Sequence, residues 1–280
     1  PIKYSTMDTF RTNYSLGYSP SYFDDGGLDP PFVQDSRQFR PVSFSHSSYY
    51  FPNTFAGDEH TFTAGQNFTR DKTTHVDNFY VPTYANYPGF VQTYVGFEDN
   101  GMFRKYPGDV QDDRTYDPRV RDWYTEAVAT PNVPVYTSPY IDFNGLGWMI
   151  TISETIDNDI GSLIGVSGGD MTIQSIRDII ANISFLETGK VTMFETSGVV
   201  VVDKEWEMDP NDPTVFTYTD LRSPSIGSGT WQQISEIPTG ETAEFEYDTG
   251  GETHIVICTH MDGFDDKYVV CAFAKKSEIV

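Results

Sequence analysis

The stretch FVQTYVGFEDNGMFRKY, residues 90–106, contains the clearest β-strand signal of the chain. Its two ends, 90–97 and 102–106, are rich in β-branched and aromatic residues, which favour strands. The segment between them ends in Asn100-Gly101, and such a pair between two strand-like runs is a strong signal for a tight turn. The stretch therefore predicts two antiparallel strands joined as a hairpin.

Downstream of this hairpin, the pattern alternates between helix and strand. A short helical stretch at 120–128 is ended by the prolines that follow it, because a helix interior does not tolerate proline. Three strand-like segments come next, separated by Asn-Gly and Asp-rich turn signals. They are Val135–Phe143, Trp148–Thr155 and Leu163–Asp170. Apolar residues over 171–183 then have the spacing of an amphipathic helix, which we expect to join two modules.

The chain before the hairpin has weaker signals. Residues 1–40 are rich in Tyr, Phe, Ser, Pro and Asp without a regular period, so we expect an irregular or extended arm with one short helix near 7–13. Apolar and hydroxyl residues predict a strand over 42–52, and a loop is expected from there to about residue 78.

A second β-rich unit is expected from about residue 189. Its predicted strands are 191–194, 199–202, 243–247, 254–258 and 268–274. The segment 203–240 reads as a long insertion between them. Antiparallel strands with sparse helices predict an α+β fold built from two tandem antiparallel sheets with flanking helices.

Composition limits the possible functions. The 280 residues are 38% apolar and 15% aromatic, which is typical of a globular chain and not of a disordered one. With 41 acidic and 18 basic side chains, the net charge is −23, and such a surface repels the phosphates of nucleic acid. The sequence has no apolar run long enough to span a membrane. Because it begins at Pro1, we expect a processed chain or a fragment, with any leader or anchor outside it.

The two cysteines, Cys258 and Cys271, each lie in a strand-like run on either side of an Asp-Gly turn signal. A hairpin there would bring the sulfurs within bridging distance, so we expect a disulfide; two buried free thiols are the alternative. Three Asn-x-Ser/Thr sequons, at Asn13, Asn67 and Asn182, are possible glycosylation sites. The disulfide and the sequons both suit a secreted chain or an ectodomain at the cell surface.

One constellation has the chemistry that a free α-amino acid needs. A carboxylate requires a bidentate cation or several donors, and a nearby ammonium requires acceptors, because both ends lose water on binding. The segment 116–124 supplies a guanidinium at Arg121, an indole N–H at Trp123, and the phenolic groups of Tyr116 and Tyr124. Acidic residues follow at the ends of predicted strands. They are Asp142, in the segment 138–142 that also holds Tyr140, and Asp170, after Gly168-Gly169.

These residues resemble, in order and approximate spacing, the amino-acid motif of double Cache sensor domains, which occur in bacterial chemoreceptors and kinases. The resemblance implies two PAS-like modules, at 41–184 and 185–280, with the ligand in the first. It also implies that Tyr116, Arg121 and Trp123 bind the ligand carboxylate. The residues implied to surround the ammonium are Tyr124, Tyr140, Asp142 and Asp170.

Within this family, Ser47–Pro52 and Gly101–Gly108 resemble the branch that includes the alpha-2/delta subunits of calcium channels. Two differences from the family mean that the signalling context of its members cannot simply be assumed for this chain. Sensor domains of this type usually begin with a long helix, which residues 1–40 do not predict. The calcium-channel relatives carry a von Willebrand A domain shortly after the Arg-x-Trp-Tyr region, where this chain continues directly to 134–143.

Each of these sites has a structural alternative. For Arg121 and Trp123 the alternative is a structural ion pair under an aromatic cover, and Asp170 could cap the helix expected near Thr172. The cluster Asp209–Asp212 offers oxygen ligands for calcium, but without regular spacing it is better explained as a solvated turn. The five scattered histidines form no zinc pattern, and neither a metal nor another cofactor is expected.

No nucleophile elbow, Walker loop or dinucleotide fingerprint occurs, so an enzyme is not expected. Two hypotheses remain. The first is an extracellular module that recognises a free α-amino acid through its carboxylate and ammonium. The alternative is an extracellular structural or adhesive subunit that assembles into oligomers or filaments, with the arm at 1–40 adding to a neighbouring copy.

Overall fold

The structure is a computed structural model that describes residues 42–44, 47–52, 62–109, 115–142, 146–198, 200–203, 228–261 and 267–279. Several predictions lie outside these residues: the arm at 1–40 with its short helix, the sequon at Asn13, the Asp209–Asp212 cluster and the Asp-Gly turn between the cysteines. The chain divides into two compact units, 1–137 with 151–171, and 138–150 with 172–280. The boundaries predicted for the two Cache modules stay a prediction.

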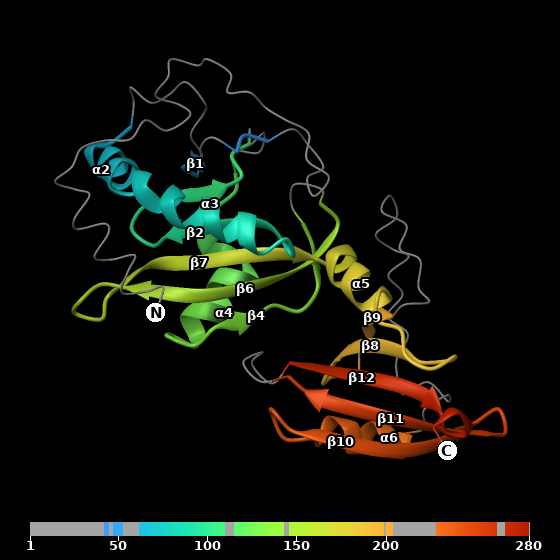
Figure 1. Cartoon of the computed structure of the whole chain (residues 1–280). Helices are drawn as coiled ribbons and strands as arrows, with labels where there is room; N and C mark the ends of the chain where they lie inside the picture. Colours follow the sequence, from blue (N-terminus) through green and yellow to red (C-terminus); the bar gives the residue numbers. More distant parts are fainter. Residues whose placement is uncertain are drawn as a thin grey trace. The chain divides into compact units, whose positions relative to one another are not determined.

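The first sheet has seven strands in the order β1-β3-β2-β7-β6-β4, with β5 paired to β6 (Figure 1). The strands are β1 Ser48–Tyr50, β2 Phe90–Phe97, β3 Phe103–Tyr106, β4 Val135–Tyr136, β5 Tyr140–Ile141, β6 Trp148–Asp157 and β7 Leu163–Thr172. The hairpin predicted from residues 90–106 is confirmed: β2 and β3 pair antiparallel, with Gly96 opposite Phe103. The turn between them contains Gly101 at φ +68, a left-handed conformation that glycine adopts without strain.

Two sequence predictions for this unit were wrong in part. The strand expected over 135–143 is two short strands, β4 and β5, with Pro139 in the interval, where a missing N–H prevents continuous pairing. The loop expected to about residue 78 contains the helix α2, Ala64–Lys72, the 3-10 turn Thr74–Val76 and the start of α3, Asp77–Asn86. The helix α2 begins with a capping box, in which Thr63 and Gln66 bond each other's backbone N–H.

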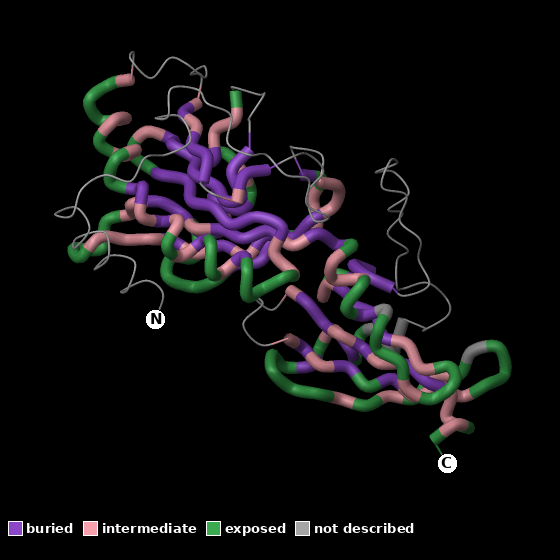
Figure 2. Tube along the Cα trace, turned by 45° about the horizontal axis from the view of Figure 1, so that its top comes forward, coloured by how far each residue is buried: buried purple, intermediate pink, exposed green. Residues whose placement is uncertain are grey.

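The first sheet buries side chains on both faces, and strand alternation decides which residue lies on which face. On one face Val95 and Phe97 pack with Tyr80 and Tyr84 of α3. On the other face Tyr94 packs with residues of α4, Asp122–Ala129, which confirms the helix predicted at 120–128. Figure 1 shows α3 and α4 on opposite sides of the sheet, and Figure 2 shows its central strands as the most continuously buried part of this unit.

The second sheet has five antiparallel strands in the order β10-β11-β12-β8-β9. The strands are β8 Lys190–Glu195, β9 Val200–Asp203, β10 Thr242–Thr249, β11 Glu252–His260 and β12 Tyr268–Lys275, and all five were predicted within a few residues. The helix predicted over 171–183 is α5, Ile173–Ala181. The helix α6, Ser228–Ser235, was missed inside the predicted insertion; among its described side chains and those just after it, Ile234 and Ile237 reach the core. The described helices include none with the length and apolar character that a bilayer crossing requires.

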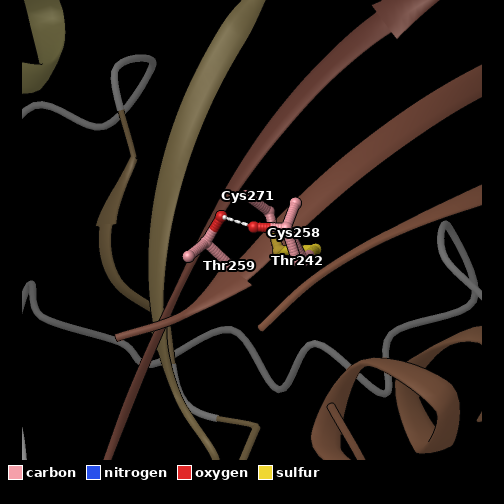
Figure 3. Close-up of a disulfide and its surroundings, with 4 residues drawn as sticks. All are labelled: Thr242, Cys258, Thr259 and Cys271. Atoms are coloured by element: carbon pink, nitrogen blue, oxygen red, sulfur yellow. Dashed lines mark hydrogen bonds between the residues drawn. A yellow bond between two sulfur atoms is a disulfide. The ribbon is translucent and has the colours of Figure 1, made fainter. Parts of the chain in front are cut away.

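The predicted disulfide is confirmed. Cys258 of β11 lies directly opposite Cys271 of β12, and their sulfurs are bonded (Figure 3). Both cysteines are fully buried in a core that includes Val256, Val269 and Phe273. On the neighbouring strand pair, Thr242 and Thr259 share a hydrogen bond of 2.9 Å. The bridge therefore joins two strands that already pair, and it reinforces their register.

Candidate functional site

The segment that carries the predicted motif changes direction at Arg121. Pro118–Val120 forms one 3-10 turn, whose N-cap Asp117 accepts a hydrogen bond from the Arg119 backbone N–H. Arg121 itself is extended, with φ −91 and ψ 148, and its carbonyl then accepts the first hydrogen bonds of α4. This break turns Trp123 and Tyr124 of the first helical turn into the core, where both are buried.

The donors predicted for a ligand carboxylate lie together. The guanidinium carbon of Arg121 is 5.7 Å from the centre of the Tyr116 ring, a cation–π distance. The indole N–H of Trp123 donates to the Tyr116 hydroxyl at 3.4 Å. Tyr116 also packs against Phe103 of β3, with ring centres 5.0 Å apart. Three of the seven predicted residues are thus one contiguous group.

A glycine on the central strand makes room for this group. A Cβ atom on Gly96 would lie 2.7 Å from Pro118 and 3.0 Å from the Trp123 ring, closer than real side-chain contacts permit. Trp123 therefore rests directly on the backbone of β2. Next to it, the Tyr94 ring meets Trp123 edge to face at 4.8 Å between ring centres.

Asp170 lies on β7, opposite Gln92 of β2, and its side chain is buried. One carboxylate oxygen accepts from the Gln92 amide at 2.7 Å. The other accepts from the Tyr94 hydroxyl and from the Thr151 hydroxyl, the latter at 2.6 Å. A buried carboxylate is tolerated when hydrogen bonds replace its water, and these three donors do so.

Tyr94 therefore joins the two predicted halves of the site. Its ring contacts Trp123, and its hydroxyl contacts Asp170. A second glycine permits this position: a Cβ on Gly168, which pairs with Tyr94 across β7 and β2, would lie 2.4 Å from the Tyr94 ring. The path Arg121–Tyr116–Trp123–Tyr94–Asp170 consists of direct contacts within one unit.

The alternative structural role for Asp170, as a helix cap, is wrong. The N-cap of α5 is Thr172, whose hydroxyl accepts from the Ser175 backbone N–H at 3.0 Å. Asp170 lies two residues earlier, on the strand, with its carboxylate bonded to three side chains from the two flanking strands, β2 and β6. The hydroxyl of Thr172, and not the carboxylate of Asp170, therefore caps α5.

Tyr124 packs against Trp123, but its hydroxyl extends elsewhere. It donates to the carboxylate of Glu98 at 2.7 Å, beside the β2–β3 turn. Burial and the bond to Glu98 raise the pKa of Tyr124, so the phenol stays protonated. Glu98 and Gln92 are six residues apart, roughly 20 Å along an extended strand. The Tyr124 hydroxyl and the Asp170 carboxylate thus face opposite ends of β2.

The other two predicted residues, Tyr140 and Asp142, fall in the second compact unit and are described within it. Tyr140 pairs with Met149 between β5 and β6. The buried Asp142 accepts from the Leu146 N–H at 3.0 Å, while its own N–H donates to the Gly147 carbonyl at 2.8 Å. These two hydrogen bonds connect Asp142 to the backbone just before β6.

The two described sequons differ in setting. Asn67 lies on α2, and its amide donates to the Phe62 carbonyl at 3.3 Å. Asn182 is the exposed C-cap residue of α5, and its amide donates to the Asp178 carbonyl at 2.7 Å. Their glycosylation stays a prediction. Within the described ranges, no three His, Cys, Asp or Glu side chains are grouped to hold a metal ion.

Sequence reasoning missed the residues that hold Asp170 in place. Gln92 and Tyr94 lie on one face of β2 because they are two positions apart, and Thr151 comes from β6. The alternation of side chains along β2 could be predicted from the stretch 90–106. The pairing of β2 with β7 could not be predicted, because it joins residues that are 78 positions apart in the chain.

The comparisons with known proteins concern the family and the fold. Residues 58–178 match the family model described as methyl-accepting chemotaxis protein-like, first PDC sensor domain. The methyl-accepting chemotaxis protein McpA of Pseudomonas putida is 38% identical over 122 residues, which are 43% of this chain and 18% of that receptor. The VWFA and cache domain-containing protein CG16868 of Drosophila melanogaster is 42% identical over 57 residues, 20% of this chain and 4% of that protein.

Among solved structures, the ligand binding domain of the Pseudomonas aeruginosa PAO1 amino acid chemoreceptor PctB, in complex with L-Arg, is similar in fold. It covers 76% of this chain and 83% of its own, with a TM-score of 0.51 and 22% identity. The two antiparallel sheets with flanking helices match the fold of Cache ligand-binding domains. The predicted resemblance to double Cache sensor domains is confirmed, and residues 58–178 carry the family match. The chain spans about a fifth of the length of the curated relatives it matches.

Proposed function

We propose that this chain is the extracellular sensor module of a receptor, and that its first Cache module binds a free α-amino acid. The observation that carries the proposal is the unbroken path of contacts from Arg121 through Trp123 and Tyr94 to Asp170. It puts a guanidinium and an indole N–H on one side and a buried carboxylate on the other. These are the groups that the two opposite charges of a zwitterion require.

In this proposal Arg121 binds the ligand carboxylate as a planar fork, with Tyr116 and Trp123 as further donors. Asp170 binds the ammonium, whereas the Tyr124 hydroxyl, which donates to Glu98 toward the other end of β2, is not assigned to the same group. Tyr124 donates its proton to Glu98, so its oxygen faces any further partner as an acceptor. The ligand acts by binding and by shifting the module between conformers, without chemical conversion.

Three further facts support the assignment as an extracellular sensor module. McpA is by name a chemotaxis protein, and the solved PctB domain is an amino acid chemoreceptor bound to L-Arg. A buried disulfide suits an oxidising compartment outside the cytoplasm. The net charge of −23 argues against nucleic acid as a partner.

Thermal unfolding in the presence of each of the twenty L-amino acids tests the proposal. A ligand at a hundredfold excess over its Kd adds about 2.7 kcal/mol of stability, which is a clear rise in Tm. We expect at least one amino acid to produce this shift. Arg121→Ala should weaken its binding about 100-fold, since a charge-assisted pair contributes on the order of 3 kcal/mol.

Arg119→Ala is the matched control. Arg119 is two residues away, forms a fork with the Asp117 carboxylate at 3.0 and 2.7 Å, and donates to the Glu98 carbonyl at 3.2 Å. It should leave ligand affinity unchanged. If none of the twenty amino acids raises the Tm, or if both arginine variants bind the same ligand as the wild type does, the proposed function is wrong.

A further inference from the structure

Tyr94, which no part of the predicted motif includes, touches both halves of the proposed site. Its ring lies against Trp123 at 4.8 Å and against Phe103 at 5.1 Å. Its hydroxyl reaches one oxygen of Asp170 and lies 3.2 Å from the Thr151 hydroxyl. Tyr94 is 2% exposed, so these contacts are made without competition from solvent.

We propose that Tyr94 is a positioning residue that sets the Asp170 carboxylate relative to Trp123, and thereby makes the site selective for ligands that carry an α-ammonium. This inference rests on the proposed function. The inference extends the proposed function, because it assigns ligand discrimination to a residue of the sheet and not to the helix that carries the motif.

The geometry explains why a tyrosine is needed at this position. A carboxylate on a strand rotates about two side-chain bonds, and each fixed donor removes part of that freedom. Gln92 holds one oxygen of Asp170 from the directly opposite residue, at 2.7 Å. Tyr94 and Thr151 hold the second oxygen from the two flanking strands. Only Tyr94 also contacts the ring system that carries the carboxylate-binding donors.

Two nearby glycines make this arrangement possible. Gly168 leaves space for the Tyr94 ring above β7, and Gly96 leaves space for Trp123 above β2. A preorganised site loses less entropy when a ligand binds, so small displacements of Asp170 are expected to appear as lost affinity. The loss of affinity should concern the contact with the ligand ammonium, and the contact with the ligand carboxylate should stay unchanged.

The test uses pairs of ligands. The first is the best-bound L-amino acid of the panel of twenty, and the second is the acid of the same skeleton with hydrogen in place of the ammonium; for L-leucine this is 4-methylpentanoate. Both are titrated into the whole chain by calorimetry. Tyr94→Phe keeps the ring contact with Trp123 and removes only the hydroxyl. We expect about a 10-fold weaker Kd for the amino acid and an unchanged Kd for the acid.

Tyr106→Phe is the matched control. Tyr106 is another buried tyrosine of the same sheet, and its hydroxyl donates at 3.1 Å to the Phe44 carbonyl on the α3 face. It should leave both affinities as they are. Gly168→Ala is an independent variant, because its Cβ would displace the Tyr94 ring and should reproduce the loss seen with Tyr94→Phe.

A double-mutant cycle with Asp170→Asn completes the test. If Tyr94 acts through Asp170, Tyr94→Phe should add no further loss once the carboxylate is gone. Equal losses for the amino acid and the acid, no loss for either, or additive losses in the cycle would each overturn the inference while leaving amino-acid binding intact. A wild-type chain that binds none of the twenty amino acids overturns the proposed function first, and this inference with it.

Discussion

The two sheets bury different kinds of side chain. The first buries the charged side chains of Arg104, Lys105 and Asp170, and each of them has a hydrogen-bond or ion-pair partner. The second has an apolar core around the Cys258–Cys271 disulfide and, among its described residues, buries fewer charged side chains, with Asp203 among them. A desolvated charge costs free energy unless it is paired, whereas a disulfide restricts the unfolded chain. The difference indicates that the first sheet is organised around specific polar geometry and the second around a covalent staple.

The largest effect should come from breaking a buried pair in the first sheet. Lys105 contacts Asp109 at 2.7 Å, and both side chains are almost fully buried. Lys105→Met leaves the Asp109 charge without its cation and should lower the free energy of unfolding by about 3–5 kcal/mol, measured in urea. The double variant Lys105→Met/Asp109→Asn should lose much less. A loss from the single variant of under about 1 kcal/mol would remove the contrast between the sheets.

Removing the disulfide should have the second largest effect. Replacing both cysteines, Cys258→Ala with Cys271→Ala, should lower the free energy of unfolding by about 3 kcal/mol, because the bridge closes a loop of 13 residues. The Tm shift produced by an amino acid should remain as in the wild type, since Arg121, Trp123 and Asp170 belong to the other unit. Thermal unfolding with and without ligand measures both. A lost ligand response would show that the staple also serves the site.

A surface pair in the first unit should have the smallest effect. Arg119 holds the pKa of Asp117 below its usual range through a side-chain hydrogen bond. Both groups are partly solvated, so Asp117→Asn should cost only about 0.5 kcal/mol near neutral pH. The pKa is depressed in the folded state, so this contribution is present above the ordinary value of about 3.9 and is lost as pH falls further. Urea unfolding across pH 2–7 measures this. A constant difference between wild type and variant would contradict it.

Much of the fold could be predicted because it depends on local patterns. The Asn100-Gly101 turn, the alternation along β2 and the spacing of α5 are all short-range signals, and each corresponds to an observed element. The helices α2 and α3 escaped prediction for the same reason. The first has no buried residue, and the second contains Pro82, so neither shows an uninterrupted apolar face.

The candidate site could be predicted only in part. Tyr116, Arg121 and Trp123 are close in sequence, so the contacts among them depend on one turn and one helix. The surroundings of Asp170 depend on which strands are neighbours, and its partners Gln92 and Thr151 are 78 and 19 residues away. The bond of Tyr124 to Glu98 likewise depends on how α4 crosses the sheet. Long-range strand order is not contained in local periodicity.

The bond between Cys258 and Cys271 has a consequence for proteolysis. A protease that cuts any single peptide bond between these residues produces two pieces of backbone that remain one molecule through the sulfurs. The nicked product would migrate as intact protein until a thiol reagent separates it. Such a cut would thus interrupt the main chain there without releasing β12 from the rest of the sheet.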